Sequence, residues 1–237
     1  MVSVLIVKNM ELLKIRGGNK ESFENKQYNI GIGISLGNKW FTVENIVEQI
    51  QWVLPYTKES LIIFIADSIH AINIEVKEGI SHEEALSKAK EMGKILLEKL
   101  REEMQSKNIN TTKIQYATWE DITDNEPYRL KVKYLYNLYE KDELFRNKIH
   151  KIVRAFTEKD DRGYSDEEIN YLGTYVLEEL PELLNRAPIK DVVCDAYAYP
   201  HDGGVPRLID AIQQGKKFPE IKENILTTEP KVFLEVR

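Results

Sequence analysis

Short apolar runs alternate along the 237-residue chain with longer segments in which apolar residues recur every three or four positions. The apolar runs predict buried strands at residues 28–35, 61–66, 113–117, 191–197 and 231–236. The spaced segments predict helices at residues 43–54, 81–104, 165–184 and 206–213, and two helices over 127–156 that break near 141–142. Apolar strands joined by helices are typical of a parallel sheet with helices on both faces. The pattern therefore predicts a doubly wound α/β fold.

The ends of these strands are candidates for a site, because ligands bind beyond the carboxyl ends of strands in such sheets. Ser35 ends the first strand, Asp67 follows the second, and Tyr199 follows the strand at 191–197. We expect these ends to meet at one edge of the sheet, where the three residues can share a pocket.

Composition and charge indicate an ordinary globular protein, with 42% hydrophobic and 30% charged residues. We expect one domain over residues 1–237. The net charge of −6 opposes nucleic-acid binding over the whole surface but allows a local basic stripe. The single cysteine, Cys194, cannot form an intramolecular disulfide, which is typical of a cytoplasmic protein. No apolar run approaches the ~20 residues that span a bilayer, so we expect no membrane partner.

Three interpretations compete for the glycine-rich turn at residues 33–37 (GISLG). The turn can simply let a helix pack closely against the strand. A dinucleotide-binding fingerprint is matched weakly by Gly31, Gly33 and Gly37, because the third glycine comes one position late. The turn also matches a nucleophile elbow, in which Ser35 attacks a carbonyl carbon and the neighbouring amide groups stabilise the oxyanion.

A serine hydrolase would need a base beside Ser35, and two candidates follow the strand at 191–197. His201 is the only histidine that follows a candidate strand near this site, but Ser35 lies early in the chain for the usual elbow. Asp202 avoids that objection, because it would form a patatin-like dyad with Ser35. The alternative function is therefore a patatin-like acyl hydrolase.

A tyrosine and a glutamate lie four residues apart in the predicted helix at 165–184. Tyr175 and Glu179 share one helical face, so a phenol and a carboxylate project side by side. The plain interpretation is a half-buried tyrosine beside a solvated glutamate.

Residues 33–41 (GISLGNKWF), 175–181 (YVLEELP) and 199–200 (YP) together resemble the cyclodipeptide synthases in order and spacing, from about residue 28 to residue 200. The resemblance implies a Rossmann-like parallel sheet similar to the catalytic domain of class I aminoacyl-tRNA synthetases. It also implies that two aminoacyl-tRNAs are condensed into a cyclic dipeptide (2,5-diketopiperazine), through an aminoacyl-enzyme and then a dipeptidyl-enzyme. An aminoacyl ester is already activated, so we expect no cofactor and no metal.

The resemblance assigns roles to five residues. It makes Ser35 the nucleophile, and it has Tyr175 and Glu179 hold the amino group of the first aminoacyl moiety. Tyr199 would assist proton transfer during cyclisation, and Tyr128 falls where the family places another pocket tyrosine.

The resemblance also bears on family class and on specificity. One class has asparagine three residues after the serine, and the other has Tyr-Pro at the late tyrosine; this chain has both Asn38 and Pro200. We assign it to the Tyr-Pro class. The family's pocket for the first amino acid corresponds here to residues on the first two strands, namely Gly31, Gly33, Ile63 and Ile65. We therefore expect an apolar pocket with room near Gly31 that selects a small to medium hydrophobic residue.

Two basic stripes are candidates for binding tRNA. Lys90, Lys94 and Arg101 lie on the long helix at 81–104, which is basic in the family, although several glutamates dilute the charge here. A second patch consists of Lys148, Lys151 and Arg154. We expect aminoacyl-tRNAs as substrates, a monomer, and no obligate protein partner; a catalytically dead interaction protein is the remaining alternative.

Overall fold

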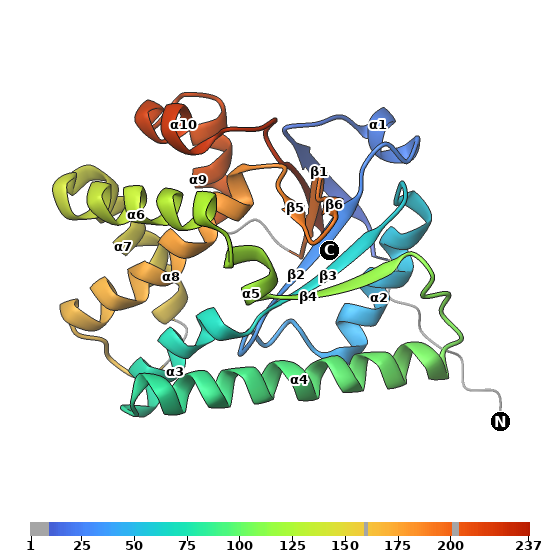
Figure 1. The fold of residues 1–237 in the computed structure, drawn as a ribbon, viewed down its shortest axis with the longest axis horizontal. Coiled ribbons are helices and arrows are strands. Elements are labelled where there is room, and N and C mark those ends of the chain that lie inside the picture. The colour runs from blue at the N-terminus through green and yellow to red at the C-terminus, as the bar shows by residue number, and fades with distance from the viewer. Residues whose placement is uncertain (1–9, 159–160, 201–203) are drawn as a thin grey trace.

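The computed structural model describes residues 10–158, 161–200 and 204–237, and its centre is a six-stranded sheet in the order β1-β8-β7-β2-β3-β4 (Figure 1). The strands are β1 Leu12–Arg16, β2 Ile30–Ser35, β3 Leu61–Ala66, β4 Ile114–Thr118, β7 Ala196–Tyr199 and β8 Val232–Val236. All run parallel except β1, which is antiparallel to β8 at the edge. The predicted parallel sheet is confirmed. The sequence does not predict β1, because that strand is charged and half-exposed.

Helices cover both faces of the sheet (Figure 1). They are α1 Lys20–Glu24, α2 Val43–Val53, α3 Ala71–Glu78, α4 His82–Ser106, α5 Trp119–Thr123, α6 Glu126–Lys141, α7 Glu143–Thr157, α8 Asp166–Leu184, α9 Gly204–Gln213 and α10 Pro219–Ile225. α2 and α4 pack against one face, and α5 to α10 enclose the core of the other. Within the described ranges, none of these helices is long and apolar enough to cross a membrane.

The helices begin and end where local sequence signals place them. Ser81 and Glu84 form a capping box at the start of α4, and Ser165 and Glu168 form another at the start of α8. Asp142 ends α6 and caps α7 by accepting a hydrogen bond from the third residue of the new helix. The predicted break near 141–142 is therefore confirmed.

The strand predicted at 191–197 is wrong in its extent. Val192–Val193 (β6) pairs with Pro188–Ile189 (β5) in a separate hairpin, and only Ala196–Tyr199 joins the main sheet. Cys194 and Asp195 lie between the two pieces, where the carboxylate of Asp195 accepts a hydrogen bond from the backbone of Asn29. A continuous apolar run does not reveal such a bend. Cys194 is free and fully buried, as expected for a core side chain.

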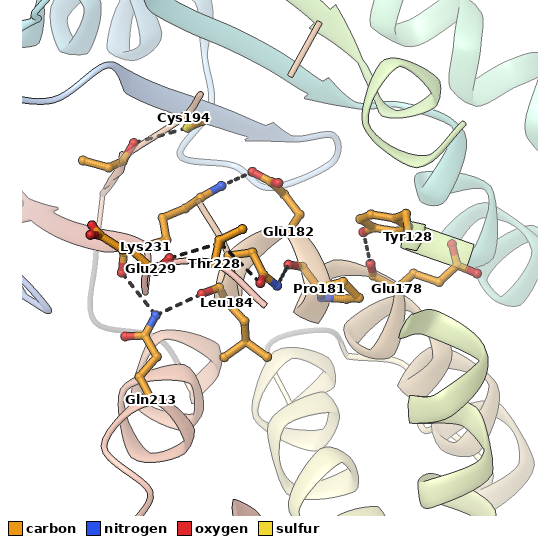
Figure 2. A network of polar contacts seen from close by, with 12 residues as sticks. Tyr128, Glu178, Pro181, Glu182, Leu184, Cys194, Gln213, Thr228, Glu229 and Lys231 are labelled. Atoms are coloured by element: carbon orange, nitrogen blue, oxygen red, sulfur yellow. Dashed lines mark hydrogen bonds and ion pairs between the residues drawn. The ribbon is translucent and has the colours of Figure 1, made fainter. Parts of the chain in front are cut away.

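A buried ion pair ties the end of α8 to the start of β8 (Figure 2). Lys231 is fully buried, and its ammonium group donates a hydrogen bond to Glu182, which is 1% exposed. The side chain of Gln213 donates hydrogen bonds to the carbonyls of Leu184 and Lys231, at 3.4 and 3.2 Å. Three elements therefore meet at this pair. Because Glu182 lies only three residues after Glu179, the pair also fixes the helical turn that carries that residue.

Replacing Lys231 tests how far the fold depends on this pair. Lys231→Met leaves the Glu182 carboxylate buried without its cation, which typically destabilises a protein by about 3–5 kcal/mol. Urea unfolding followed by circular dichroism should show that loss. The double variant Lys231→Met/Glu182→Leu removes both charges and should recover most of the stability. A single variant as stable as the unmodified protein would show that the pair does not hold α8 in place.

Candidate active site

The turn after β2 places Ser35 at the carboxyl edge of the sheet. Ser35 lies beside Ala66 at the end of β3. Gly37 has a φ of +77°, a conformation that side chains oppose, so glycine is required at this point of the turn. The side-chain oxygen of Asn38 accepts a hydrogen bond from the backbone N–H of Trp40 at 3.0 Å, and the backbone N–H of Asn38 donates one to the Ser35 carbonyl at 3.4 Å. Asn38 therefore stabilises the turn that presents the serine.

α8 and β7 bring the other three predicted catalytic residues to the same place. The Tyr175 phenol is close enough to interact with the side chains of Ser35 and Glu179, and the Tyr199 phenol with that of Ser35. All four side chains line one cavity of about 390 Å³. The structure thus joins Ser35, Tyr175, Glu179 and Tyr199, which are up to 164 positions apart, into one group of interacting side chains.

The electrostatics of this group favour neutral forms. Burial raises the pKa of Glu179 to about 8, opposed by the hydrogen bond from Tyr175. Burial, followed by the charge of Glu179, also raises the pKa of both Tyr175 and Tyr199 well above the usual range. The phenols therefore remain hydrogen-bond donors. In the described part of the chain, Glu179 forms no ion pair with a lysine or arginine, so the cavity has a carboxyl group available for a cation.

His70 is a cavity residue that the sequence analysis does not identify. It lies on a short 3₁₀ turn, Ser68–His70, just beyond β3, and its ring packs against Gly37. Its Nδ1 atom is 3.3 Å from the side-chain amide of Asn73. Burial, reinforced by the charge of Lys77, lowers the pKa of His70 to about 4, so the ring is neutral at physiological pH. Its place four residues beyond a strand end was the one available sequence signal.

The pocket expected from Gly31, Gly33, Ile63 and Ile65 is not formed. In the β2–β3 register Gly31 lies beside Ile62 and Ile32 beside Ile63, so the glycines and the two isoleucines belong to opposite faces of the sheet. None of the four lines the cavity.

The expected room near Gly31 is also absent. A methyl group added to Gly31 would lie 2.7 Å from the Cys194 sulfur, and one added to Gly33 would overlap the Tyr197 hydroxyl. The space above the two glycines is therefore already filled by core side chains.

Tyr128 and Pro200 lie outside this cavity. Tyr128 is buried, and its hydroxyl donates to the backbone carbonyl of Glu178 (Figure 2). It lines a separate hollow, together with Tyr136 and Glu178. Pro200 is buried directly after β7 and does not line the cavity either. The structure therefore does not bring these two residues to Ser35.

The basic residues of α4 are largely engaged in contacts within the protein. Lys90 forms an ion pair with Glu120 at 2.5 Å, and the Arg101 guanidinium lies 4.8 Å from the centre of the Tyr116 ring. Lys94 is exposed. His201 and Asp202, the two candidate hydrolase bases, lie outside the described residues. Among the described side chains, no group of three or more His, Cys, Asp or Glu is arranged to hold a metal ion.

Comparisons with known proteins agree with one another. The family model described as cyclodipeptide synthase matches residues 20–215. The cyclo(L-leucyl-L-phenylalanyl) synthase of Streptomyces noursei is 23% identical over 192 residues, which are 80% of each chain. A cyclodipeptide synthase structure from Bacillus thermoamylovorans has a TM-score of 0.73 and 19% identity, over 96% of both chains. A synthase from Candidatus Glomeribacter gigasporarum bound to Phe-tRNAPhe has a TM-score of 0.55 and 17% identity, over 88% of both chains.

These findings define the chain as an enzyme with a Rossmann-like fold. The Mycobacterium tuberculosis structure with the same fold is described as showing that cyclodipeptide synthetases are related to type I tRNA synthetases. The chain belongs to the cyclodipeptide synthase family, because the family model covers most of its length. The comparisons do not favour the patatin-like alternative.

The raised pKa of Glu179 predicts a specific pH dependence of stability. The folded protein holds a proton on Glu179 up to about pH 8, whereas an unfolded glutamate loses it near pH 4.3. The folded state therefore binds more protons between these values, and its stability falls as the pH rises through this window. Glu179→Gln removes the effect. The melting temperature of the variant minus that of the unmodified protein should therefore increase between pH 5.5 and pH 8.5.

Glu167→Gln, at an exposed position of the same helix, is the matched control. Its melting temperature relative to the unmodified protein should stay constant over the same pH range. Equal pH profiles for the two variants would show that Glu179 is not desolvated.

Proposed function

We propose that the enzyme forms a cyclic dipeptide from two aminoacyl-tRNAs by way of an acyl-enzyme on Ser35. The single observation that carries the proposal is the convergence of Ser35, Tyr175, Glu179 and Tyr199 in one cavity of a chain from this family. Relatives support the substrate class, since one is named for a cyclic dipeptide and another is bound to Phe-tRNAPhe.

The first step is transfer of an aminoacyl group to the serine. The Oγ atom of Ser35 attacks the ester carbonyl, the bond to the tRNA ribose breaks, and the serine proton leaves on the ribose hydroxyl. The ester supplies the free energy, so positioning and oxyanion stabilisation are the main demands on the protein. The turn after Ser35 would lie beside the reacting carbon, and the backbone N–H groups of Leu36 and Gly37 are its candidates for that purpose.

Glu179 positions the amino group of the bound residue. A substrate ammonium favours the ionised carboxyl, so binding releases the proton that Glu179 holds below about pH 8. The carboxylate then accepts a proton from the ammonium, and the free amine attacks the ester carbonyl of the second aminoacyl-tRNA. The ester bond to the second tRNA breaks, and its ribose oxygen takes up the proton that the attacking amine loses. The product of this step is a dipeptidyl group that is still esterified to Ser35.

Cyclisation releases the product. The amine of the second residue attacks the ester on Ser35, closing the six-membered ring and expelling the serine oxygen. Tyr199 contacts Ser35 and retains its proton, so it can donate that proton to the departing oxygen and recover one from the attacking amine, directly or through the substrate. The cavity walls include Leu172, Val176 and Val205, which favour apolar side chains in the substrates.

Production of the chain in a bacterial host, followed by mass spectrometry of the medium, tests this function and identifies both amino acids. Diketopiperazines that are absent from an empty-vector culture are the expected result. Free fatty acids without diketopiperazines would instead indicate the patatin-like hydrolase.

Ser35→Ala should abolish diketopiperazine formation while leaving the melting temperature within a few degrees of the unmodified value, because the acyl-enzyme needs the hydroxyl. Intact-mass analysis after incubation with labelled aminoacyl-tRNA should find one aminoacyl group on the unmodified enzyme, located at Ser35 by peptide mapping. Undiminished product from the variant, or a label on Cys194, would require another nucleophile.

Glu179→Gln keeps the size of the side chain but removes the charge that pairs with the ammonium, so product formation should fall at least ~10-fold. Asp202→Asn separates the two mechanisms, because a patatin-like enzyme would lose activity through Asp202 and not through Glu179. A normal rate in Glu179→Gln would leave this residue without a role in the reaction.

A further inference from the structure

A cluster of basic side chains lies where α7, α9 and the segment after α9 meet. Lys148 is half-buried, while Lys151, Arg207 and Lys217 are exposed. Burial lowers the pKa of Lys148, and so do the positive charges of Lys217, Lys151 and Arg207. The packing brings these segments together, because Gly204 of α9 lies against Ile152 of α7, and the ring of Phe218, next to Lys217, is 5.1 Å from that of Phe145 on α7. The four cations therefore lie on three segments that contact one another. We name these four residues the α7–α9 cluster.

Three members of the cluster, the lysines, lack the ion pairs that many other basic side chains of the described chain have. In the described parts of the chain, no ion pair joins Lys148, Lys151 or Lys217 to a carboxylate within 4.0 Å. Helix α7 carries four lysines and arginines against one glutamate. Helix α4 carries five against six glutamates. The protein is acidic overall, with a net charge of −6, so the crowding of cations on α7 is a local feature that favours an anionic ligand.

The two helices that carry the cluster also form the wall of the Ser35 cavity. Val153 and Phe156 of α7, and Val205 and Pro206 of α9, line it. Phe156 is 43% exposed although it is a large apolar residue. Its ring is therefore available at the cavity and is not part of the core.

Spacing along α7 suits a short stretch of single-stranded RNA. Lys148 and Phe156 are eight positions apart, roughly 12 Å at ~1.5 Å per residue. Two or three nucleotides cover such a distance. A basic groove that tracks phosphates beside an aromatic ring that stacks on a base is the usual arrangement for single-stranded nucleic acid.

We propose that the α7–α9 cluster binds phosphates of the single-stranded 3′ end of an aminoacyl-tRNA, and that Phe156 stacks on its terminal base at the cavity mouth. This inference rests on the proposed function, which requires the terminal ribose ester to reach Ser35. It assigns the electrostatic contact with tRNA to α7 and α9, in place of the α4 stripe expected from the sequence.

Two matched triple variants test the electrostatic part, since each removes three positive charges. Lys148→Ala/Lys151→Ala/Lys217→Ala removes three members of the cluster, and Arg207 is kept because it has further interactions. Lys90→Ala/Lys94→Ala/Arg101→Ala removes the α4 stripe. Binding of deacylated tRNA is measured over a range of salt concentrations. The slope of log affinity against log salt concentration is the salt slope. The cluster variant should bind at least ~10-fold more weakly, and its salt slope should flatten by up to ~2, since single strands contribute about 0.7 per phosphate.

The α4 variant should keep most of its affinity and its salt slope. Lys148→Arg/Lys151→Arg/Lys217→Arg retains the charges and should also bind normally, which separates a loss of charge from a loss of structure. Wild-type affinity in the cluster alanine variant, or the larger loss in the α4 variant, would overturn the inference. Because diketopiperazine formation by the unmodified enzyme is followed in parallel, failure of the proposed function is recognised separately.

The stacking part has its own test. Phe156→Leu keeps an apolar side chain but removes the ring, and it should weaken tRNA binding about 5-fold or more. Phe156→Trp should bind at least as well as the unmodified enzyme. A tRNA that lacks its 3′-terminal adenosine should bind the unmodified enzyme and Phe156→Leu equally. A leucine effect that persists with the shortened tRNA would place the ring elsewhere than on the terminal base.

Discussion

The lack of side chains at Gly31 and Gly33, on the face of β2 that also carries Ser35, is the constraint on which the rest of the site depends. Tyr197 crosses that face, with its hydroxyl where the Cβ of any other residue at position 33 would lie, and Phe64 packs beside it. The same Tyr197 ring lines the cavity and has the Lys231 ammonium 5.9 Å from its centre. The glycines, the cavity floor and the buried ion pair are therefore one packed unit, and a substitution in any of them affects the others.

Burial of the cavity residues has two consequences that oppose each other. Desolvation makes the ionised form of Glu179 unfavourable in the free enzyme, so ionising this residue costs free energy unless a cation compensates it. Under the proposed function, the same burial would limit the access of water to an ester on Ser35. An amine-bearing substrate would resolve the conflict, because its ammonium would compensate a carboxylate that has no lysine or arginine partner among the described residues. A neutral acyl group lacks that contribution, which gives a physical reason for the cavity to prefer aminoacyl over fatty acyl esters.

The candidate residues that the structure brings together as expected depend on local signals or on general rules of parallel sheets. Ser165 and Glu168 cap α8 through contacts three residues apart, so the face that carries Tyr175 and Glu179 could be predicted. Ser35 and Tyr199 meet because strand ends in a parallel sheet lie at one edge. Gly31 and Gly33 do not lie on the same face of the sheet as Ile63 and Ile65, because the face on which Ile63 lies depends on the register of β3 against β2, which no local pattern specifies. Glu182 and Lys231 pair across 49 positions, and His70 reaches the cavity by a short turn after β3; neither leaves a periodic signal.

The basic cluster proposed to bind tRNA and the residues proposed to carry out the reaction lie in different places. This separation affects how fast tRNA binds and leaves. With a net charge of −6, long-range electrostatics do not favour approach of a polyanion. A basic cluster acts only within about 8 Å at physiological ionic strength. Under the proposed function, tRNA would therefore be held weakly and locally, near the end that carries the ester. Such binding suits an enzyme that must release two used tRNAs in each cycle, because tight contacts along the tRNA body would slow both departures. Discrimination between substrates then depends mainly on the cavity, where the α-ammonium meets Glu179 and the side chain meets apolar walls.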